Sequence, residues 1–256
     1  MRGAGERPGT GRLHAVGSSL MQDISSASSH DISGAHSHDV SDVLRKLAMV
    51  FTTFEGRLEQ TPLIRKLTRG RFEIDDYRAF LIGLRQQVKD GALWMSRAAS
   101  NVDEEHLELR SRLMRHAVAE HRDFRLLEAD YVATGGELSA IVGARKNIGS
   151  EALSAWMFHE ASQPNPFGLL GAMWIIEGLG SIKAAEWGRL AQSRLALPDS
   201  AVRFLLYHGE NDTTHIAEFE EMLGLVLPDE KIARRIVRVA EVTARLYALQ
   251  IEEITA

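Results

Sequence analysis

The chain has 256 residues, of which 45% are hydrophobic and 25% charged, and its formal net charge is −5. It contains no cysteine, which excludes disulfides, thiolate nucleophiles, zinc fingers and cysteine-ligated iron–sulfur clusters. The negative charge argues against wrapping of nucleic acid, and no apolar run reaches the ~18 residues of a membrane-spanning helix. We therefore expect a cytoplasmic protein with no nucleic-acid or membrane partner, in which any metal ion has His, Asp and Glu ligands.

Residues 1–40 are rich in Gly, Ser and His and contain few large apolar side chains. Such a segment cannot bury enough surface to offset the entropy of ordering, so we expect a disordered tail. It lacks the apolar core of a secretory signal, and Met21 is an alternative start of translation. His30, His36 and His38 suggest a loose metal-capturing tract, although a polar tail that happens to contain histidine is the simpler interpretation.

From about Ser41 onward, hydrophobic residues recur with a period near 3.6, and no strand alternation or hairpin turn is evident. Ser41 and Asp42 are suitable N-cap residues, while proline and glycine mark most of the later breaks. Helices are expected at about 43–60, 72–100, 103–133, 149–161, 167–194, 198–224 and from 228 almost to the C-terminus. The sequence thus predicts an all-α domain at 41–256, a seven-helix antiparallel bundle.

The expected sixth helix contains three metal-ligand residue types on one face. His208, Asp212 and His215 follow the spacing H-x3-D-x2-H, and positions i, i+4 and i+7 lie on the same side of a helix. The rest of that face is apolar, where His and Asp are costly unless their polar atoms are satisfied. Two imidazoles and a carboxylate suit Fe, Mn or Zn, while a buried hydrogen-bonded cluster is the structural alternative.

The expected fifth helix contains a single carboxylate, Glu177, within the apolar run LLGAMWIIEGLG. A buried glutamate must be paired, protonated or metal-bound, and an arginine across the bundle is the ordinary partner. Gly178 and Gly180 weaken the helix, which indicates that another helix or a ligand approaches closely there.

The expected third helix also contains metal-ligand residue types on one face. His116 and Glu120 are one turn apart, and Asp123 lies three residues beyond Glu120 on the same face. His121 is rotated by about 100° from Glu120, so we do not expect it in a site on that face. Each of these residues taken alone is more simply explained as a solvated charge.

Together, these three helices predict a non-haem diiron or dimanganese site. Antiparallel packing would bring Glu120 and Glu177 together with the three ligand types of the sixth helix around one cavity. The Glu-x-x-His pair on two helices that a ferritin-like site uses is absent, which disfavours that fold. Trp174 and Tyr207 are candidates to line a substrate pocket, although packing in the core is the simpler role for both.

The segment from about Asp103 to Leu223 resembles the haem-oxygenase-like diiron oxidases, also called iron-containing redox enzymes. The resemblance is carried by H-x3-E followed by LLEADYVATGG, by QPNPFGLLGAMWIIEGLGS, and by HGENDTTH, in the family's order. It implies the seven-helix fold that haem oxygenase, thiaminase II and pyrroloquinoline-quinone synthase share. A haem oxygenase proper is not expected, because no histidine occurs between residues 41 and 60.

The resemblance also implies a ligand set. The two iron-binding carboxylates are Glu120 and Glu177, and the sixth-helix ligands are those of the H-x3-D-x2-H motif. The family has a further histidine ligand shortly after the first glutamate, whereas this sequence has Asp123 three residues on. Either His116 or Asp123, or neither, then provides the sixth ligand. An extra carboxylate would favour Mn or weaken one metal position.

The activity implied by the resemblance is that of an O2-dependent diiron oxidase or oxygenase in specialised metabolism. It acts on an amino acid, amine or fatty acid, by N-oxygenation or oxidative C–C or C–H cleavage through a peroxo-diferric intermediate. Two iron ions and O2, with Mn/Fe as a variant, an external electron donor and a homodimer are expected. The alternatives are a metal-independent bundle that binds a small molecule or pigment, and an interaction protein with a degenerate metal site.

Overall fold

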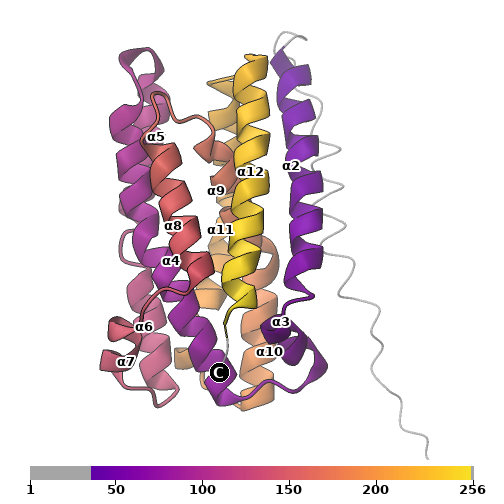
Figure 1. The fold of residues 1–256 in the computed structure, drawn as a ribbon, viewed down its shortest axis with the longest axis vertical. Coiled ribbons are helices and arrows are strands. Elements are labelled where there is room, and N and C mark those ends of the chain that lie inside the picture. The colour runs from indigo at the N-terminus through magenta and orange to yellow at the C-terminus, as the bar shows by residue number, and fades with distance from the viewer. Residues whose placement is uncertain (1–35, 255–256) are drawn as a thin grey trace, which may run out of the picture.

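A computed structural model describes residues 36–254, with the side chains of 36–39 and 210–216 outside that description. All regular elements of the described range are helical, and the long helices run roughly alongside one another (Figure 1). The α-helices are α2 (His36–Leu58), α3 (Pro62–Arg69), α4 (Ile74–Asn101), α5 (Leu107–Glu120), α6 (Phe124–Ala133), α7 (Leu138–Gly143), α8 (Ile148–Ala161), α9 (Leu169–Leu179), α10 (Ala185–Leu195), α11 (Arg203–Gly224) and α12 (Glu230–Glu252). The predicted all-α bundle is confirmed, with α9 and α12 packed together near its centre.

The predicted number of seven helices is not confirmed, because some expected helices are divided. The expected third helix becomes the 3₁₀ turn η1 (Glu104–His106), α5 and α6. The expected fifth helix becomes α9, the π-helical turn η2 (Gly180–Ala184) and α10, while α7 and the 3₁₀ turn η3 (Asp199–Ala201) are additional. Two of these departures, the break between α5 and α6 and the turn η2, lie within a few residues of the predicted ligands Glu120 and Glu177.

Most helix ends match the sequence signals. Pro62 begins α3, and Gly135, with φ at 83°, follows the end of α6 in a left-handed conformation that glycine adopts at low cost. By contrast, α2 begins at His36, five residues before the predicted start at Ser41. Asp42 therefore lies inside the helix, where it pairs with Arg45 and Lys46 instead of capping. The rest of the predicted tail, residues 1–35, lies outside the described residues.

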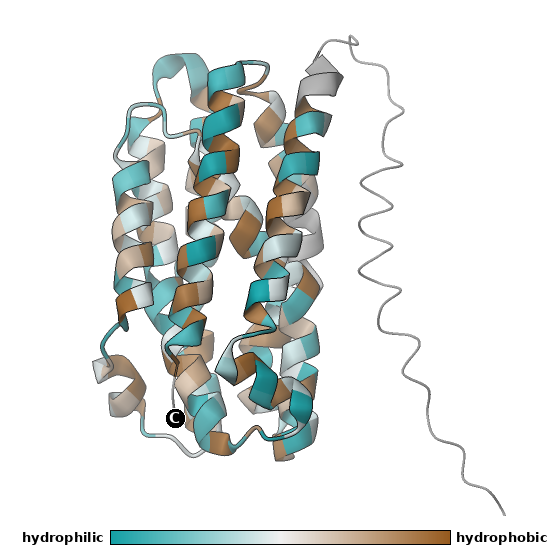
Figure 2. Ribbon diagram, turned by 45° about the vertical axis from the view of Figure 1, so that its right-hand side comes forward, coloured by the Kyte–Doolittle hydropathy of each residue, from teal (hydrophilic) through white to brown (hydrophobic). Residues whose placement is uncertain are grey.

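The core is formed by the apolar stripes of these helices. Hydrophilic and hydrophobic residues alternate around the rods in Figure 2, as expected for amphipathic helices that surround one core. A very close helix approach involves Gly171 of α9, where an added Cβ would lie 2.0 Å from the carbonyl oxygen of Ile236 on α12. In the part of the chain that the structure describes, no helix is both long and apolar enough to cross a membrane.

Candidate metal centre

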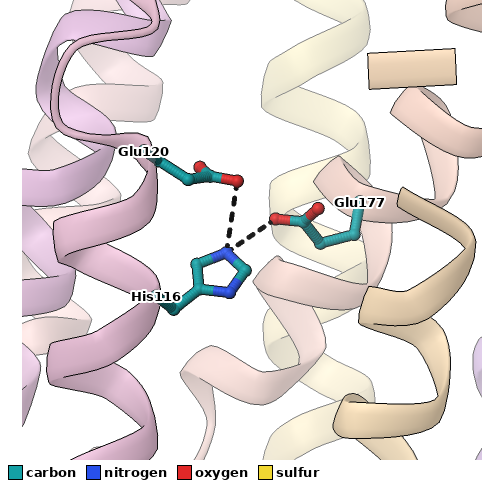
Figure 3. Close-up of side chains that lie close together, drawn as sticks. All are labelled: His116, Glu120 and Glu177. Carbon is teal, nitrogen blue, oxygen red and sulfur yellow. Dashed lines mark hydrogen bonds and ion pairs between the residues drawn. The ribbon is translucent and has the colours of Figure 1, made fainter. Parts of the chain in front are cut away.

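Helices α5 and α9 bring three predicted residues together inside the bundle (Figure 3). The Nε2 atom of His116 lies 3.0 Å from an oxygen of Glu177 and 3.4 Å from an oxygen of Glu120. One potential ligand atom from each of the three residues lies within 4.8 Å of those from the other two. Glu120 and Glu177 are 57 residues apart in the chain, so the fold itself creates this cluster.

The cluster lies largely out of water. The exposed fractions of the side chains are 7% for His116, 11% for Glu177 and 20% for Glu120. Burial opposes the charged imidazolium, but hydrogen bonds and the charges of the two carboxylates raise the pKa of His116 to about 10. Burial, and then the charge of Glu177, raises the pKa of Glu120 above its usual range. Two carboxylates thus share the imidazole of His116.

The chain changes direction directly after Glu120. Backbone hydrogen bonds of the i, i+3 type, including Asp123 N to Glu120 O at 3.1 Å, replace the α-helical pattern between α5 and α6. Asp123 stands at this bend, with one carboxylate oxygen 3.4 Å from Nε2 of His208. His121 is exposed and approaches the carbonyl oxygen of Val118, so it faces away from the cluster as predicted.

The backbone is also irregular on the other side of the site. Glu177 is followed at Gly180–Ala184 by the π-helical turn η2, which packs against α11. Single π-helical turns inserted in helices frequently occur at functional sites. An added Cβ at Gly178 would lie 3.0 Å from the ring of Phe51, which confirms the predicted close approach of another helix.

A cavity of about 80 Å³ adjoins this cluster, and Glu120, Glu177 and His208 form part of its wall. Its apolar lining includes Phe80, Trp94, Met173, Trp187, Phe204 and Tyr247. Among the described residues of this lining, Gln87 is the only amide side chain, and neither lysine nor arginine is present. The cavity therefore combines a strongly polar wall of ligand-type residues with otherwise largely apolar surroundings.

The two aromatic residues predicted for a substrate pocket lie elsewhere. Trp174 is buried against Phe219, with ring centroids 5.2 Å apart, and does not line the cavity. Tyr207 is 50% exposed, because one step along α11 from His208 turns its side chain toward the surface. The sequence instead missed α4, whose Gln87 and Trp94 form part of the cavity wall. The adjacent Gln86 and Gln87 of this helix carry no sequence signal that places either of them beside a cavity.

Asp212 and His215 belong to α11, but their side chains fall within the undescribed range 210–216. Their role as ligands stays a prediction. The described donors are chemically suited to a metal ion, since carboxylate oxygens and imidazole nitrogens bind Fe and Mn well. A cluster of two buried carboxylates and one imidazole also has negative charge that a divalent cation would offset. The residues present therefore fit an iron site.

Residues 93–248 match the sequence profile of a family described as iron-containing redox enzymes. The chain belongs to this family. The match includes all of the predicted ligands, so the resemblance inferred from the motifs is confirmed. Among curated proteins, none matches this member of the iron-containing redox enzyme family.

Solved structures confirm the fold of this family member. A Shewanella denitrificans domain of unknown function with a haem oxygenase-like fold has a TM-score of 0.77 at 20% identity, covering 84% of this chain and 91% of that one. A TenA homologue from Pseudomonas syringae pv. tomato has a TM-score of 0.69 at 18% identity, covering 83% and 92%. A TenA homologue from P. horikoshii has a TM-score of 0.60 at 13% identity, covering 82% and 96%. At these identities the likeness concerns the haem-oxygenase-like fold alone.

Proposed function

We propose that this protein is an O2-dependent non-haem diiron oxidase or oxygenase. The observation that carries the proposal is the cluster of His116, Glu120 and Glu177, whose two glutamates line an otherwise largely apolar cavity. A purely structural cluster has no need of a cavity beside it, whereas a catalytic metal needs space for O2 and substrate. Membership of the iron-containing redox enzyme family supports iron as the metal.

Two metal positions account for the ligand-type residues better than one. We assign His116, Glu120 and Glu177 to the first position, because their ligand atoms already converge. Asp123 and His208, which lie 3.4 Å apart, belong to the second position together with the predicted ligands Asp212 and His215. Asp123 then takes the place of the histidine expected after Glu120, and His116 supplies an additional imidazole. A site with this extra carboxylate also suits a Mn/Fe pair.

The iron ions supply oxygen activation, and the residues of the chain determine what reaches them. The apolar wall excludes bulk water. It also offers no opposite charge to a second ionised group of a substrate, if that group lies far from the metals. The substrate is accordingly a small amino acid, amine or fatty acid whose apolar part fits beside Trp94 and Trp187. Electrons beyond those of the substrate come from an external donor, and the chain acts as a homodimer.

A metal-independent bundle that binds a small molecule or pigment is the competing function. It has one specific support, since a proton on His116 already joins the two carboxylates without a metal. An interaction protein with a degenerate metal site shares that support. Both alternatives predict that the cluster does not retain iron.

Metal content and O2 reactivity test the proposal. The protein is loaded with Fe(II) without air, desalted, and its iron per chain is measured before exposure to O2. Retention of two irons per chain and O2 uptake coupled to their oxidation support the diiron assignment. Loss of iron during desalting, or bound iron that is inert to O2, contradicts it and favours a metal-independent bundle. Candidate amines, amino acids and fatty acids are then screened for accelerated O2 uptake.

A further inference from the structure

A second group of buried polar side chains lies between α4 and α8, separate from the metal ligands. Asp90 of α4 accepts hydrogen bonds from Ser154 of α8, at 2.7 Å, and from Lys146 in the connection before α8. The side chains of Asp90 and Lys146 are 13% and 20% exposed. This group therefore reaches from the protein surface into the bundle, and we call Asp90, Lys146 and Ser154 the Asp90 triad.

A small hollow of about 10 Å³ lies beside the Asp90 triad. Asp90, Ser150, Ser154 and Gln87 contribute polar side chains to its lining. A cavity of roughly 10–15 Å³ by this measure holds one water, provided that polar partners surround it. The hollow therefore has the size and the chemistry of a single-water site.

Two glutamines that neighbour residues of this lining, without being part of it, carry buried polar atoms that lack a protein partner in the described range. Ser150 donates a hydrogen bond of 3.1 Å to Oε1 of Gln250, but Nε2 of Gln250 has no partner among the described residues. The Oε1 atom of Gln86 likewise has none within the described range. Both glutamines are at most 1% exposed, and buried polar atoms in folded proteins are nearly always satisfied by protein or ordered water.

The hollow is adjacent to the cavity beside the metal centre. Gln87, Trp94 and Ile176 line both spaces, so these three side chains form the wall between them. Gln87 is the amide of this wall and can hydrogen-bond to water on either side. The rest of the described cavity lining provides no other amide and no lysine or arginine.

We propose that the Asp90 triad, the water of the hollow and Gln87 form a proton-entry path to the cavity. The inference rests on the proposed function, because reduction of O2 toward water takes up one proton for each electron. Those electrons come from the substrate and the external donor. In the relay step, an N–H bond of the Lys146 ammonium breaks as an O–H bond forms on Asp90. That O–H bond then breaks as a new one forms on the water, which passes one of its own protons past Gln87 to the reduced oxygen in the cavity. Lys146 regains a proton from solvent, and no electron moves along the path.

The decisive variant is Asp90→Asn, which keeps the size of the side chain and removes its acid. Glu160→Gln is a matched control, since Glu160 is a buried carboxylate paired with Arg235 that lines neither space. For the Fe(II)-loaded protein, we expect Asp90→Asn to slow O2 consumption by about tenfold or more with unchanged iron content. The slowing should be greater in D2O, and added formate should restore part of the rate.

A readout that needs no metal tests the hydration of the path. We expect a high-resolution crystal structure of the wild-type protein to show an ordered water in the hollow, and Ser154→Val to remove it. Ser154→Val should also slow O2 consumption if Asp90→Asn does not fold. A dry hollow, or an Asp90→Asn protein that consumes O2 at the rate of Glu160→Gln, overturns the proposal. If the wild-type protein itself fails to retain iron or to consume O2, the proposed function fails instead.

Discussion

Two buried acidic clusters in this bundle are satisfied in different ways. Glu160 of α8 is 3% exposed and pairs with Arg235 of α12, whose guanidinium is permanently charged and partly in water. Glu120 and Glu177 instead share His116, an imidazole that is charged only when protonated. The first cluster is an ordinary structural ion pair with regular helices around it. The second adjoins a cavity and lies between two backbone irregularities, which is where a metal ion can replace a proton.

The largest difference between the two clusters should appear when one carboxylate is removed from each. Glu177→Gln takes a ligand atom from the cluster, and we expect its iron affinity to fall by about 100-fold or more, since even outer-shell substitutions at metal sites lower affinity by 10–100-fold. Glu160→Gln should keep its iron but lose about 1–3 kcal/mol of stability, because it leaves Arg235 without its carboxylate partner. Equilibrium dialysis with Fe(II) and thermal unfolding separate the two effects. Equal iron affinity in both variants would remove Glu177 from the site.

Two histidines allow a comparison in which the expected change in iron content is smaller. His208 lines the cavity next to Asp123, whereas His121 is exposed at the bend after α5. We expect His208→Ala to retain only about half of the wild-type iron, because it loses a ligand of the second position alone. His121→Ala should bind the wild-type amount. His215→Ala should resemble His208→Ala in iron content, with helicity intact by circular dichroism. Wild-type iron in both His208→Ala and His215→Ala would contradict the second position.

Alanine substitutions at two glycines compare a tight helix contact with an open surface position. Gly171→Ala would place a Cβ 2.0 Å from the carbonyl oxygen of Ile236, and overpacking of this kind lowers stability by about 1–3 kcal/mol. Gly56 of α2 is exposed and has nothing within 4 Å of an added Cβ. Gly56→Ala should therefore stabilise the protein by about 0.4–1 kcal/mol, by restricting the unfolded chain. Urea unfolding measures both, and a neutral Gly171→Ala would show that α9 and α12 can separate at little cost.

The sequence predicts the regular part of this molecule well and the irregular part poorly. The period of 3.6 and the proline and glycine breaks place most helices, because each signal acts within a few residues. The division between α5 and α6 has no such signal, since residues 121–123 contain neither proline nor glycine. The sequence predicts Asp123 on the same helical face as Glu120 only if the helix is continuous. Asp123 reaches His208 because the backbone bends there, which depends on tertiary packing.

The cavity shows the same limit. The sequence alone predicts the ligand-type residues, because polar groups on apolar helix faces are costly unless they have a partner. The prediction of Trp174 and Tyr207 as pocket residues rests on their nearness in the chain to Glu177 and His208. One step along a helix turns a side chain by about 100°, so adjacency in sequence does not place a residue in a pocket. Gln87 and Trp94 reach the cavity from α4, which the pattern of α4 alone does not reveal.

The protonation of His116 leads to a further predicted effect, which is seen in metal-free protein. Its pKa is about 10 in the folded state, above the ordinary histidine value of 6.5, so the folded state holds the proton more tightly than the unfolded state. The stability contributed by this group is then fully present below pH 6.5 and is lost as the pH rises through 10. Between pH 7 and 8 we expect a loss of about 1 kcal/mol relative to His116→Gln, by urea unfolding with a chelator present.

Saturating metal should largely abolish that pH dependence. A metal ion binds the neutral imidazole, so the proton must leave His116 when the site is filled. Stability relative to metal-free protein should then increase as the pH rises from 7 to 8, because fewer protons compete with the metal. Mn(II) is a suitable probe, since it avoids oxidation during the titration. If wild type and His116→Gln show the same pH dependence both with and without Mn(II), the imidazole holds neither the proton nor the metal.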